Sequence, residues 1–379
     1  MINSKLPNVG TTIFTIMSKM AEEYNAINLS QGFPDFEVSA ELIELINKHM
    51  KAGKNQYAPM PGIMPLREII AEKTYNLYSL KYNPETEITV TAGGTQAIYT
   101  AITSIVREDD EVIVFEPSYD CYLPAIELNG GRPIFIQLKQ PDYSIDWNEV
   151  QKAISSRTKM IIINSPHNPT GSIMTAFDLE KLSKITAGSN IVILSDEVYE
   201  HILFDGYEHQ SVARFPKLAE RSFIVSSFGK TFHATGWKMG YCVAPAVLMA
   251  EFRKVHQFLV FSVNTAIQYA LAEFLQNENN YKGLEKFYQE KRDYFAKLLK
   301  GSRFGLKPAS GTYFQLLDYS KISEEKEIAF AEYLTKKVGV ASIPVSVFYH
   351  KTFDNKVLRF CFAKSNETLE KAAEKLIKL

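Results

Sequence analysis

The chain has 379 residues, of which 46% are hydrophobic and 22% are charged, and its net charge is −1 at pH 7. A chain of this length and ordinary composition is expected to form two globular domains, or one large domain with an appendage. The near-neutral balance offers no basic surface for nucleic acid or anionic lipid, and no apolar run approaches the ~20 residues that cross a bilayer.

The predicted elements begin with a short N-terminal arm and a helix at residues 12–23. The centre of the chain then alternates short apolar runs with helix-length segments such as residues 176–187. We interpret the apolar runs as buried strands, at residues 111–117, 132–138, 160–166, 190–196 and 222–228. Apolar strands that alternate with helices indicate an α/β fold with a mostly parallel sheet covered by helices on both faces.

The pattern changes after about residue 270. The sequence predicts a polar helix, a strand, a helix, a strand and a final amphipathic helix, at residues 282–301, 311–320, 327–338, 356–364 and 367–379. We expect these elements to join the N-terminal arm in a smaller α+β domain built from both chain ends. The predicted division is an arm with part of the small domain at residues 1–40, a large domain at 41–275, and the C-terminal small domain at 276–379.

Polar side chains end three of the predicted strands, namely Asn164, Asp196 and Ser227. Because ligands bind at the carboxyl ends of strands in such sheets, this placement predicts one shared site. A buried carboxylate at Asp196 is costly unless it is paired, and a protonated heterocyclic nitrogen is a suitable partner; an N-cap is the alternative role. Tyr199 reaches the same edge if a helical turn begins there.

Lys230 lies in FIVSSFGKTFHATGWKMG, residues 223–240, where an apolar strand ends in small and hydroxyl residues. A lysine in this position can form a Schiff base with an aldehyde cofactor, and a second cation, Lys238, follows. The triplet GKT also ends phosphate-binding P-loops, but that motif needs glycine where this chain has Ile224. A surface lysine after a strand is the simpler reading of this segment alone.

Two segments could hold a phosphate and an aromatic ring. TAGGTQAIYTAI, residues 91–102, places two glycines before an apolar helical pattern, and amides at a helix N-terminus bind phosphate; an ordinary turn is the alternative. EPSYDCY, residues 116–122, ends a strand with a proline turn and Tyr119, which is otherwise a core or surface tyrosine.

Two further segments could bind a carboxylate. In NSPHNPTG, residues 164–171, Asn168 precedes a proline, so its backbone is extended and its side chain can point across the strand ends; a plain loop is the alternative. VLRFCFAK, residues 357–364, places Arg359 inside an alternating apolar strand. A guanidinium there can bind the carboxylate of a ligand through two parallel hydrogen bonds. The alternative is a structural salt bridge within the protein.

The order of these motifs resembles that of the class I/II aminotransferases, the fold-type I enzymes that use pyridoxal 5′-phosphate (PLP). Eight segments carry the resemblance: LSQGFPDF, NQYAPMPG, TAGGTQ, EPSYD, HNPTG, SDEVYE, SFGKTFHATGWKMG and LRFCFAK. It extends from about residue 10 to the end. FSVNT, GTYFQLLDYS and SIPVSVF are most similar to the kynurenine/glutamine aminotransferase branch and, within it, to bacterial methionine aminotransferases. The resemblance implies the PLP-dependent transferase fold.

The resemblance also implies the roles of the cofactor-binding residues. Lys230 would carry PLP as a Schiff base, and Asp196 would pair with the ring nitrogen. Tyr199 and Asn168 would hydrogen-bond the ring oxygen, and Tyr119 would stack on the ring. The phosphate would be held by Ser227, Lys238 and the amides of Gly94, Thr95 and Gln96. Lys230, Asp196 and Tyr199 are thus the expected catalytic residues.

Substrate binding and assembly are implied in the same way. Arg359 would bind the substrate α-carboxylate, with help from Asn168 and the backbone of Gly32. Tyr57 would reach the phosphate site of a neighbouring subunit, so a homodimer with shared active sites is expected. Phe14, Tyr57 and Phe261 correspond to pocket positions, which suits large apolar or aromatic substrate side chains.

The expected activity is therefore PLP-dependent transfer of the amino group of methionine and other large apolar or aromatic amino acids to a 2-oxo acid, by a ping-pong mechanism. Three alternatives remain open: a cysteine-conjugate β-lyase, a kynurenine/glutamine aminotransferase, and a non-catalytic PLP-binding regulator. Cys121, Cys242 and Cys361 form no CxxC pair and are expected to be reduced thiols, which favours the cytoplasm. No metal site, nucleic-acid partner or membrane association is expected.

Overall fold

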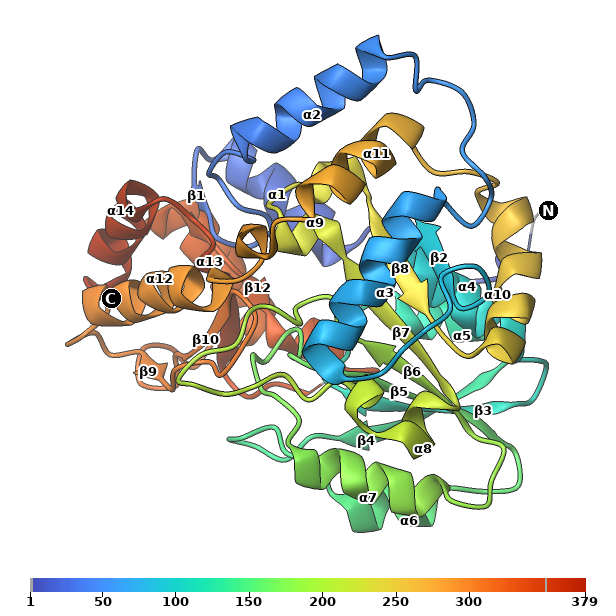
Figure 1. Ribbon diagram of the computed structural model, residues 1–379. Helices are drawn as coiled ribbons and strands as arrows, with labels where there is room; N and C mark the ends of the chain where they lie inside the picture. Colours follow the sequence, from blue (N-terminus) through green and yellow to red (C-terminus); the bar gives the residue numbers. More distant parts are fainter. Residues whose placement is uncertain (1–2, 352) are drawn as a thin grey trace.

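The computed structural model describes residues 3–351 and 353–379. Its centre is a seven-stranded sheet with the order β2-β8-β7-β6-β5-β3-β4 (Figure 1). The strands are β2 (Ile88–Thr91), β3 (Glu111–Glu116), β4 (Arg132–Gln137), β5 (Thr158–Asn164), β6 (Val192–Asp196), β7 (Ser222–Ser227) and β8 (Gly240–Val243). In this sheet β8 runs antiparallel to β2 and β7, and the other neighbouring strands pair in parallel. The prediction of a mostly parallel sheet is therefore confirmed.

Helices cover both faces of this sheet because its strands are apolar on both sides. In β3, Ile113 and Phe115 pack on one face, whereas Val112 and Val114 pack on the other. The first face is covered by α2 (Ala40–Lys51), α3 (Met64–Tyr78), α6 (Trp147–Ala153), α7 (Ala176–Thr186), α8 (Pro216–Ala219) and α11 (Thr265–Phe274). The second face is covered by α4 (Gly94–Ile105), α5 (Tyr122–Leu128) and α10 (Ala246–Leu259).

The structure differs from the prediction at the sheet edges. The run at residues 132–138 was expected to be a buried strand, but β4 is the edge strand, and its ends Arg132 and Gln137 are exposed. The strands β2 and β8 were not predicted, because each has only four residues and includes threonine or glycine instead of a continuous apolar run. They pair with each other although they are distant in sequence.

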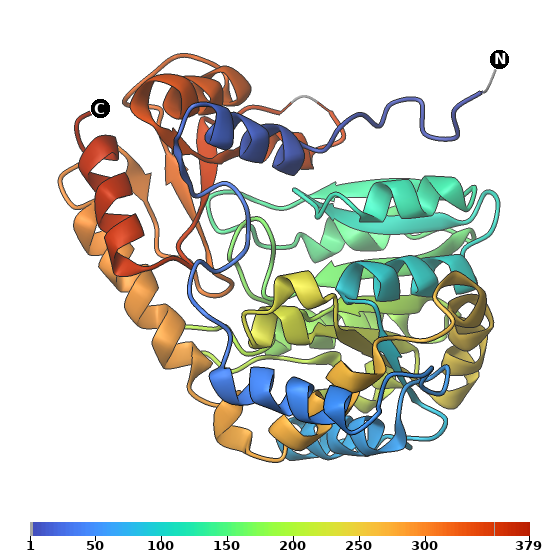
Figure 2. The same ribbon diagram turned by 90° about the horizontal axis from the view of Figure 1, so that it is seen from above.

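A smaller α+β part combines both ends of the chain, as predicted. Its four-stranded antiparallel sheet has the order β12-β13-β10-β9, and its strands are β9 (Gly305–Leu306), β10 (Phe314–Asp318), β12 (Ile343–Pro344) and β13 (Val357–Cys361). N-terminal β1 (Ile27–Asn28) pairs with C-terminal β11 (Val340–Ala341). The helices are α1 (Ile13–Glu23), α12 (Leu284–Leu298), α13 (Glu327–Tyr333) and α14 (Asn366–Leu376). Figure 2 shows α1 beside the C-terminal elements.

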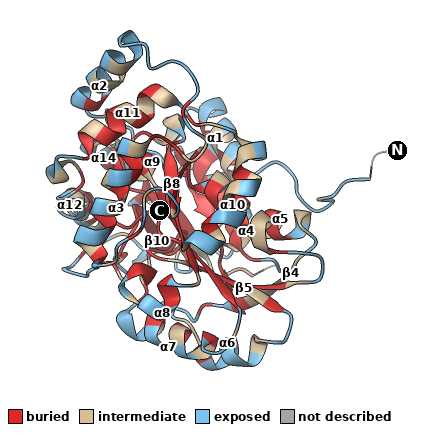
Figure 3. Ribbon diagram, turned by 45° about the vertical axis from the view of Figure 1, so that its right-hand side comes forward, coloured by how far each residue is buried: buried red, intermediate tan, exposed pale blue. Residues whose placement is uncertain are grey.

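The two parts meet beside the carboxyl ends of the central strands. Leu203 forms a β-bridge with Gly311, and the amides of Ser310 and Gly311 donate to the carbonyl of Gly171. Figure 3 shows that the buried residues are concentrated in the sheets, with exposed residues on the outer helix faces. Among the described residues, no helix combines the length and apolarity required to cross a bilayer.

Candidate active site

A cavity of about 140 Å³ lies where the carboxyl ends of β5, β6 and β7 meet. Its walls include residues that end or follow five different strands, namely Gly93, Gly94, Thr95, Tyr119, Asn164, Asn168, Asp196, Tyr199, Ser227, Lys230 and Lys238. An adjoining cavity of about 220 Å³ is lined by Tyr122 and His167 but by no lysine or arginine. The first cavity therefore has the cationic groups that a phosphate-bearing ligand needs.

Lys230 lies in the short helix α9 (Phe228–Thr231), directly after β7. Its Nζ donates to the hydroxyl of Tyr313 at 2.9 Å and to the carbonyl of Gly32 at 3.2 Å. Burial disfavours the ammonium form and lowers the pKa of this amine to about 8. Near neutral pH, the neutral and nucleophilic fraction of Lys230 is thus much larger than that of an ordinary lysine, which favours Schiff-base formation.

Asp196 is the last residue of β6 and is 3% exposed. Its Oδ2 accepts a hydrogen bond from the hydroxyl of Tyr122 at 2.6 Å. The side chain of Asn164 donates to the Asp196 carbonyl at 2.8 Å, which fixes the backbone. Burial raises the pKa of the carboxyl to about 6. No lysine or arginine of the described residues forms a salt bridge with Asp196, so a cationic nitrogen in the cavity would supply the charge it lacks.

The loop between β2 and α4 forms the phosphate-binding candidate. Gly93 has a φ of +81°, and a Cβ built there would lie 3.4 Å from the side chain of Lys238. Gly94 begins the 12-residue helix α4, so its amide and that of Thr95 belong to the unpaired N-terminal turn, where anions bind. Ser227 and Lys238 complete this wall.

Gln96, whose backbone amide is predicted to bind the phosphate, has a second role through its side chain. Its side chain does not line the cavity; Oε1 accepts from the amide of Ala92 at 2.9 Å, and Nε2 contacts Thr100 and His256. Its side chain therefore stabilises the glycine loop from behind.

Tyr199, Asn168 and Tyr119 surround the same space. Tyr199 is buried, and burial raises its pKa well above the usual value, so its hydroxyl stays protonated and can donate to a ring oxygen. The backbone N–H of Asn168 donates to Oδ1 of Asn164 at 2.8 Å. Tyr119 contacts the hydroxyl of Thr95 at 3.3 Å, which places the aromatic ring beside the glycine loop.

Arg359 is 1% exposed and points from β13 toward the large sheet. One guanidinium nitrogen donates to Oδ1 of Asn168 at 2.7 Å, another to the carbonyl of Ser30 at 3.0 Å, and Nε has no partner among the described residues. The predicted alternative, a structural salt bridge, is not found within the described part of the chain. Burial lowers its pKa to about 10, so it remains charged at neutral pH. It is thus a buried cation suited to an anionic ligand.

The three expected pocket residues lie in two places. The ring of Phe14 is 5.2 Å from the guanidinium carbon of Arg359 and 6.0 Å from the ring of Phe348. Tyr57 and Phe261 instead contact each other at 5.1 Å and are 81% and 54% exposed. Neither lines the cavity within this chain.

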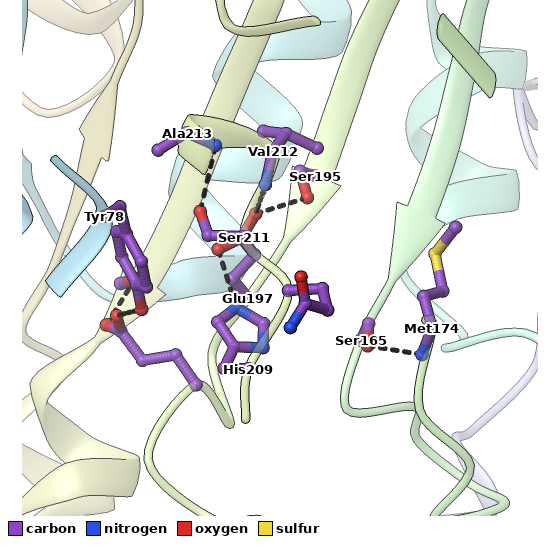
Figure 4. Close-up of polar contacts among 12 residues, drawn as sticks. Tyr78, Ser165, Met174, Ser195, Glu197, His209, Ser211, Val212 and Ala213 are labelled. Carbon is purple, nitrogen blue, oxygen red and sulfur yellow. Dashed lines mark hydrogen bonds and ion pairs between the residues drawn. The ribbon is translucent and has the colours of Figure 1, made fainter. Parts of the chain in front are cut away.

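A buried carboxylate next to Asp196 fixes the turn that carries Tyr199. Glu197 accepts from Ser195 Oγ at 2.7 Å and from the amide of Val212 at 3.1 Å, and it contacts His209 Nε2 at 2.8 Å. Figure 4 shows these groups around Glu197. They anchor the segment after β6, which contributes Asp196 and Tyr199 to the cavity wall, to residues 209–212.

Two residues of the site received no role from the sequence. Tyr122 belongs to the motif EPSYDCY, in which only Tyr119 was singled out. Tyr313 lies just before β10, 83 residues after Lys230. No local pattern indicates that Tyr313 and Lys230 meet; only the packing of the small part against the sheet joins them.

The residues present fit PLP. The buried amine of Lys230, with its lowered pKa, matches the aldehyde of PLP. The Asp196 carboxylate, which has no cationic partner, matches the ring nitrogen. The glycine loop beside Lys238 matches the phosphate. All line one cavity.

Comparisons with known proteins agree with this chemistry. Residues 24–376 match the family described as aminotransferase class I and II. Methionine aminotransferase from Escherichia coli K12 is 51% identical over 377 residues, covering 99% of this chain and 98% of the relative. Human kynurenine–oxoglutarate transaminase 1 is 35% identical, covering 95% and 94% of the two chains.

A solved structure shows the same likeness. A crystal structure of an Escherichia coli protein, described as identifying a methionine aminotransferase function, superimposes with a TM-score of 0.98 at 50% identity, and each chain is covered completely. The chain therefore belongs to the class I and II aminotransferases, enzymes that use pyridoxal 5′-phosphate to move amino groups between amino acids and 2-oxo acids.

Proposed function

We propose that this aminotransferase takes its amino group from methionine and other large apolar or aromatic amino acids. The proposal rests on the aromatic rings that surround Arg359. Its guanidinium carbon lies 3.8, 5.2 and 5.4 Å from the ring centres of Phe314, Phe14 and Phe348. A substrate whose α-carboxylate is bound by Arg359 has its side chain beside aromatic surface, which favours apolar groups.

The cations of the site support the same preference. The cavity lining includes two lysines, Lys230 and Lys238, and both already have proposed roles. An acidic substrate side chain would thus enter without a counter-charge from the lining residues. The likeness to the Escherichia coli methionine aminotransferase supports methionine as a donor.

We propose that Lys230, Asp196 and Tyr199 perform the chemistry. When bound, PLP supplies an aldehyde that takes up the amino group and a ring that stores the charge left on Cα. Arg359 and Asn168 orient the α-carboxylate. Lys230 would act as the base that takes the Cα proton of the substrate. Asp196 would hold a proton on the ring nitrogen. Release of one 2-oxo acid before the second one binds would give ping-pong kinetics.

We further propose a homodimer. Tyr57, Phe258 and Phe261 are 81%, 87% and 54% exposed, and Tyr57 contacts Phe261. Aromatic side chains on one exposed surface are typical of an interface. In such a dimer, Tyr57 would complete the phosphate site of the partner subunit. We also propose a cytoplasmic location, consistent with Cys121, Cys242 and Cys361 as free thiols; fractionation of the source cells would test it.

A donor screen tests the substrate proposal. We expect higher kcat/KM for methionine and phenylalanine than for aspartate with one 2-oxo acid acceptor. Arg359→Lys should lower kcat/KM for every donor by a similar factor, on the order of 10- to 100-fold, because the fork to the shared α-carboxylate is lost. Preference for aspartate would refute the apolar pocket. Pyruvate and ammonia formed from a cysteine conjugate without an acceptor would identify the lyase instead.

A further inference from the structure

The hydroxyl of Tyr313 contacts the amine of Lys230, yet no role was predicted for it. Lys230 Nζ donates to the Tyr313 hydroxyl at 2.9 Å, and this hydroxyl donates to the carbonyl of Gly32 at 2.7 Å. Lys230 Nζ also reaches the Gly32 carbonyl at 3.2 Å. Three segments, from the N-terminal arm, the large sheet and the small part, thus meet at one amine.

The position of the Tyr313 hydroxyl is fixed by packing. Its side chain is completely buried. The ring of Tyr199 lies edge-on at 5.2 Å, and the rings of Phe314 and Tyr288 lie at 5.0 and 5.7 Å. Close-packed rings leave few other rotamers. Burial also raises the pKa of Tyr313 well above its usual value, so the phenol keeps its proton and its lone pairs remain available to Lys230.

These contacts determine the direction of the amine lone pair. A neutral lysine amine has two N–H bonds, and the structure provides two acceptors, the Tyr313 hydroxyl and the Gly32 carbonyl. With both hydrogens engaged, the lone pair points away from the acceptors. Lys230 also lines the cofactor cavity, so the base is presented to that cavity.

We propose that Tyr313 is a catalytic residue whose hydroxyl receives the Lys230 amine after the substrate has displaced it, and holds the lone pair toward the substrate for proton transfer. This inference rests on the proposed role of Lys230 as the base. It gives the small part of the molecule a direct contact with a reacting atom. The flexible lysine chain would otherwise adopt many rotamers at this stage.

The variant Tyr313→Phe tests the proposal because it removes the hydroxyl and keeps the ring. The matched control is Tyr288→Phe, which removes a neighbouring hydroxyl that contacts His233 at 2.9 Å and not Lys230. We expect the half-reaction with methionine, followed by stopped-flow absorbance, to slow at least about tenfold in Tyr313→Phe. The isotope effect of Cα-deuterated methionine should increase, because proton transfer becomes more rate-limiting. Tyr288→Phe should resemble the wild type in both respects.

A second measurement uses the protein without cofactor. Competitive acetylation of Lys230 across a pH series, with mass spectrometry of its peptide, gives the pKa of the amine. Losing an acceptor that stabilises the ammonium form should lower this pKa in Tyr313→Phe, but not in Tyr288→Phe. If Tyr313→Phe does not fold, Tyr313→Met, which also lacks the hydroxyl, is measured in the same way.

The outcomes separate the two proposals. A wild-type rate, isotope effect and Lys230 pKa in the Tyr313 variant would overturn the role of Tyr313 while leaving that of Lys230 intact. A wild-type protein that binds PLP but does not convert methionine would instead overturn the proposed substrate.

Discussion

At the scale of single residues, burial sets the charge of the groups proposed to perform the reaction. The two groups at the centre of the chemistry shift in opposite directions: burial lowers the pKa of the Lys230 amine to about 8 and raises that of the Asp196 carboxyl to about 6. In both cases the neutral form gains relative to the charged form. In the proposed site, the ring nitrogen of PLP would supply the cation that Asp196 lacks and would further stabilise its carboxylate.

Lys230→Ala should abolish turnover and the visible absorbance of lysine-bound PLP. The other lysine of the cavity lining, Lys238, lies at the phosphate wall and cannot take its place. PLP should still bind through the remaining contacts. Spectra and methionine turnover of the purified variant check this. Full turnover in Lys230→Ala would contradict the assignment of the base.

Asp196→Asn should lose most turnover while still binding PLP. The difference in stability between this variant and the wild type should depend on pH. A carboxyl pKa raised from 3.8 to about 6 means that the folded protein binds this proton more tightly than the unfolded chain. Its contribution to stability therefore falls as pH rises through this range. At pH 8 the cofactor-free Asp196→Asn protein should be more stable than the wild type by on the order of 3 kcal/mol, and near pH 4 almost equal.

Urea unfolding of the cofactor-free proteins at both pH values measures this difference. Asp142→Asn is the control, because Asp142 is an exposed carboxylate paired with Lys307 at the surface. It should give only a small change. If the stability difference between Asp196→Asn and the wild type does not depend on pH, the pKa of the wild-type Asp196 carboxyl is not raised.

At the scale of elements, a buried ion pair connects α3 to the segment after β6. Lys73 Nζ lies 2.8 Å from Glu200 Oε1, and both side chains are 5% exposed. Glu200 also accepts from Tyr78 at 2.7 Å and from Ser226 at 2.8 Å. The charged pair lowers the pKa of Glu200 and raises that of Lys73, against the effect of burial. These bonds fix the turn containing Tyr199 against α3 and β7.

Glu200→Gln should destabilise the protein by about 3–5 kcal/mol, because the Lys73 ammonium remains buried without its counter-charge. Adding Lys73→Met should recover part of the loss. Glu367→Gln breaks the exposed pair with Lys371 and should change stability far less, because solvent screens this pair. Denaturant midpoints of the four proteins check this order, and equal effects of Glu200→Gln and Glu367→Gln would contradict it.

At the scale of the whole molecule, the chain passes from one part to the other near residues 40 and 275. α1 and β1 pack in the small part, whereas α2, which begins at Ala40, contacts α11 through Lys48 and Glu273 at 2.6 Å. We therefore propose the domain limits 1–40, 41–275 and 276–379. The active site lies where the two parts meet, since Asn168 and Lys230 contact Arg359 and Tyr313.

The dimer proposal predicts complementation between two inactive variants. Tyr57→Ala and Lys230→Ala subunits, mixed and allowed to exchange, should regain activity that neither variant has alone. A mixed dimer would contain one site with Lys230 from one chain and Tyr57 from the other. Sedimentation should show a dimer at the same time. No recovery in a proven mixed dimer would mean that Tyr57 acts within its own chain.

Much of this organisation could be predicted because it is encoded locally. The apolar strands β3, β5, β6 and β7 were found from their composition, and their polar ends Asn164, Asp196 and Ser227 were predicted to meet. The four-residue strands β2 and β8 were not, because their pairing and not their composition makes them strands. The amide of Gln96 was predicted to bind the phosphate, but the support that its side chain gives to the glycine loop was not predicted.

Local patterns of strand, turn or helix start were enough to predict the α/β fold, the order of the motifs, and the lysine, aspartate and arginine through which the chain resembles its family. The contacts between distant segments became known from the folded chain alone: Tyr122 with Asp196, Tyr313 with Lys230, and Arg359 with Asn168 across 191 positions. Burial and hydrogen bonding, which set pKa and geometry, depend on neighbours in space that no local pattern specifies.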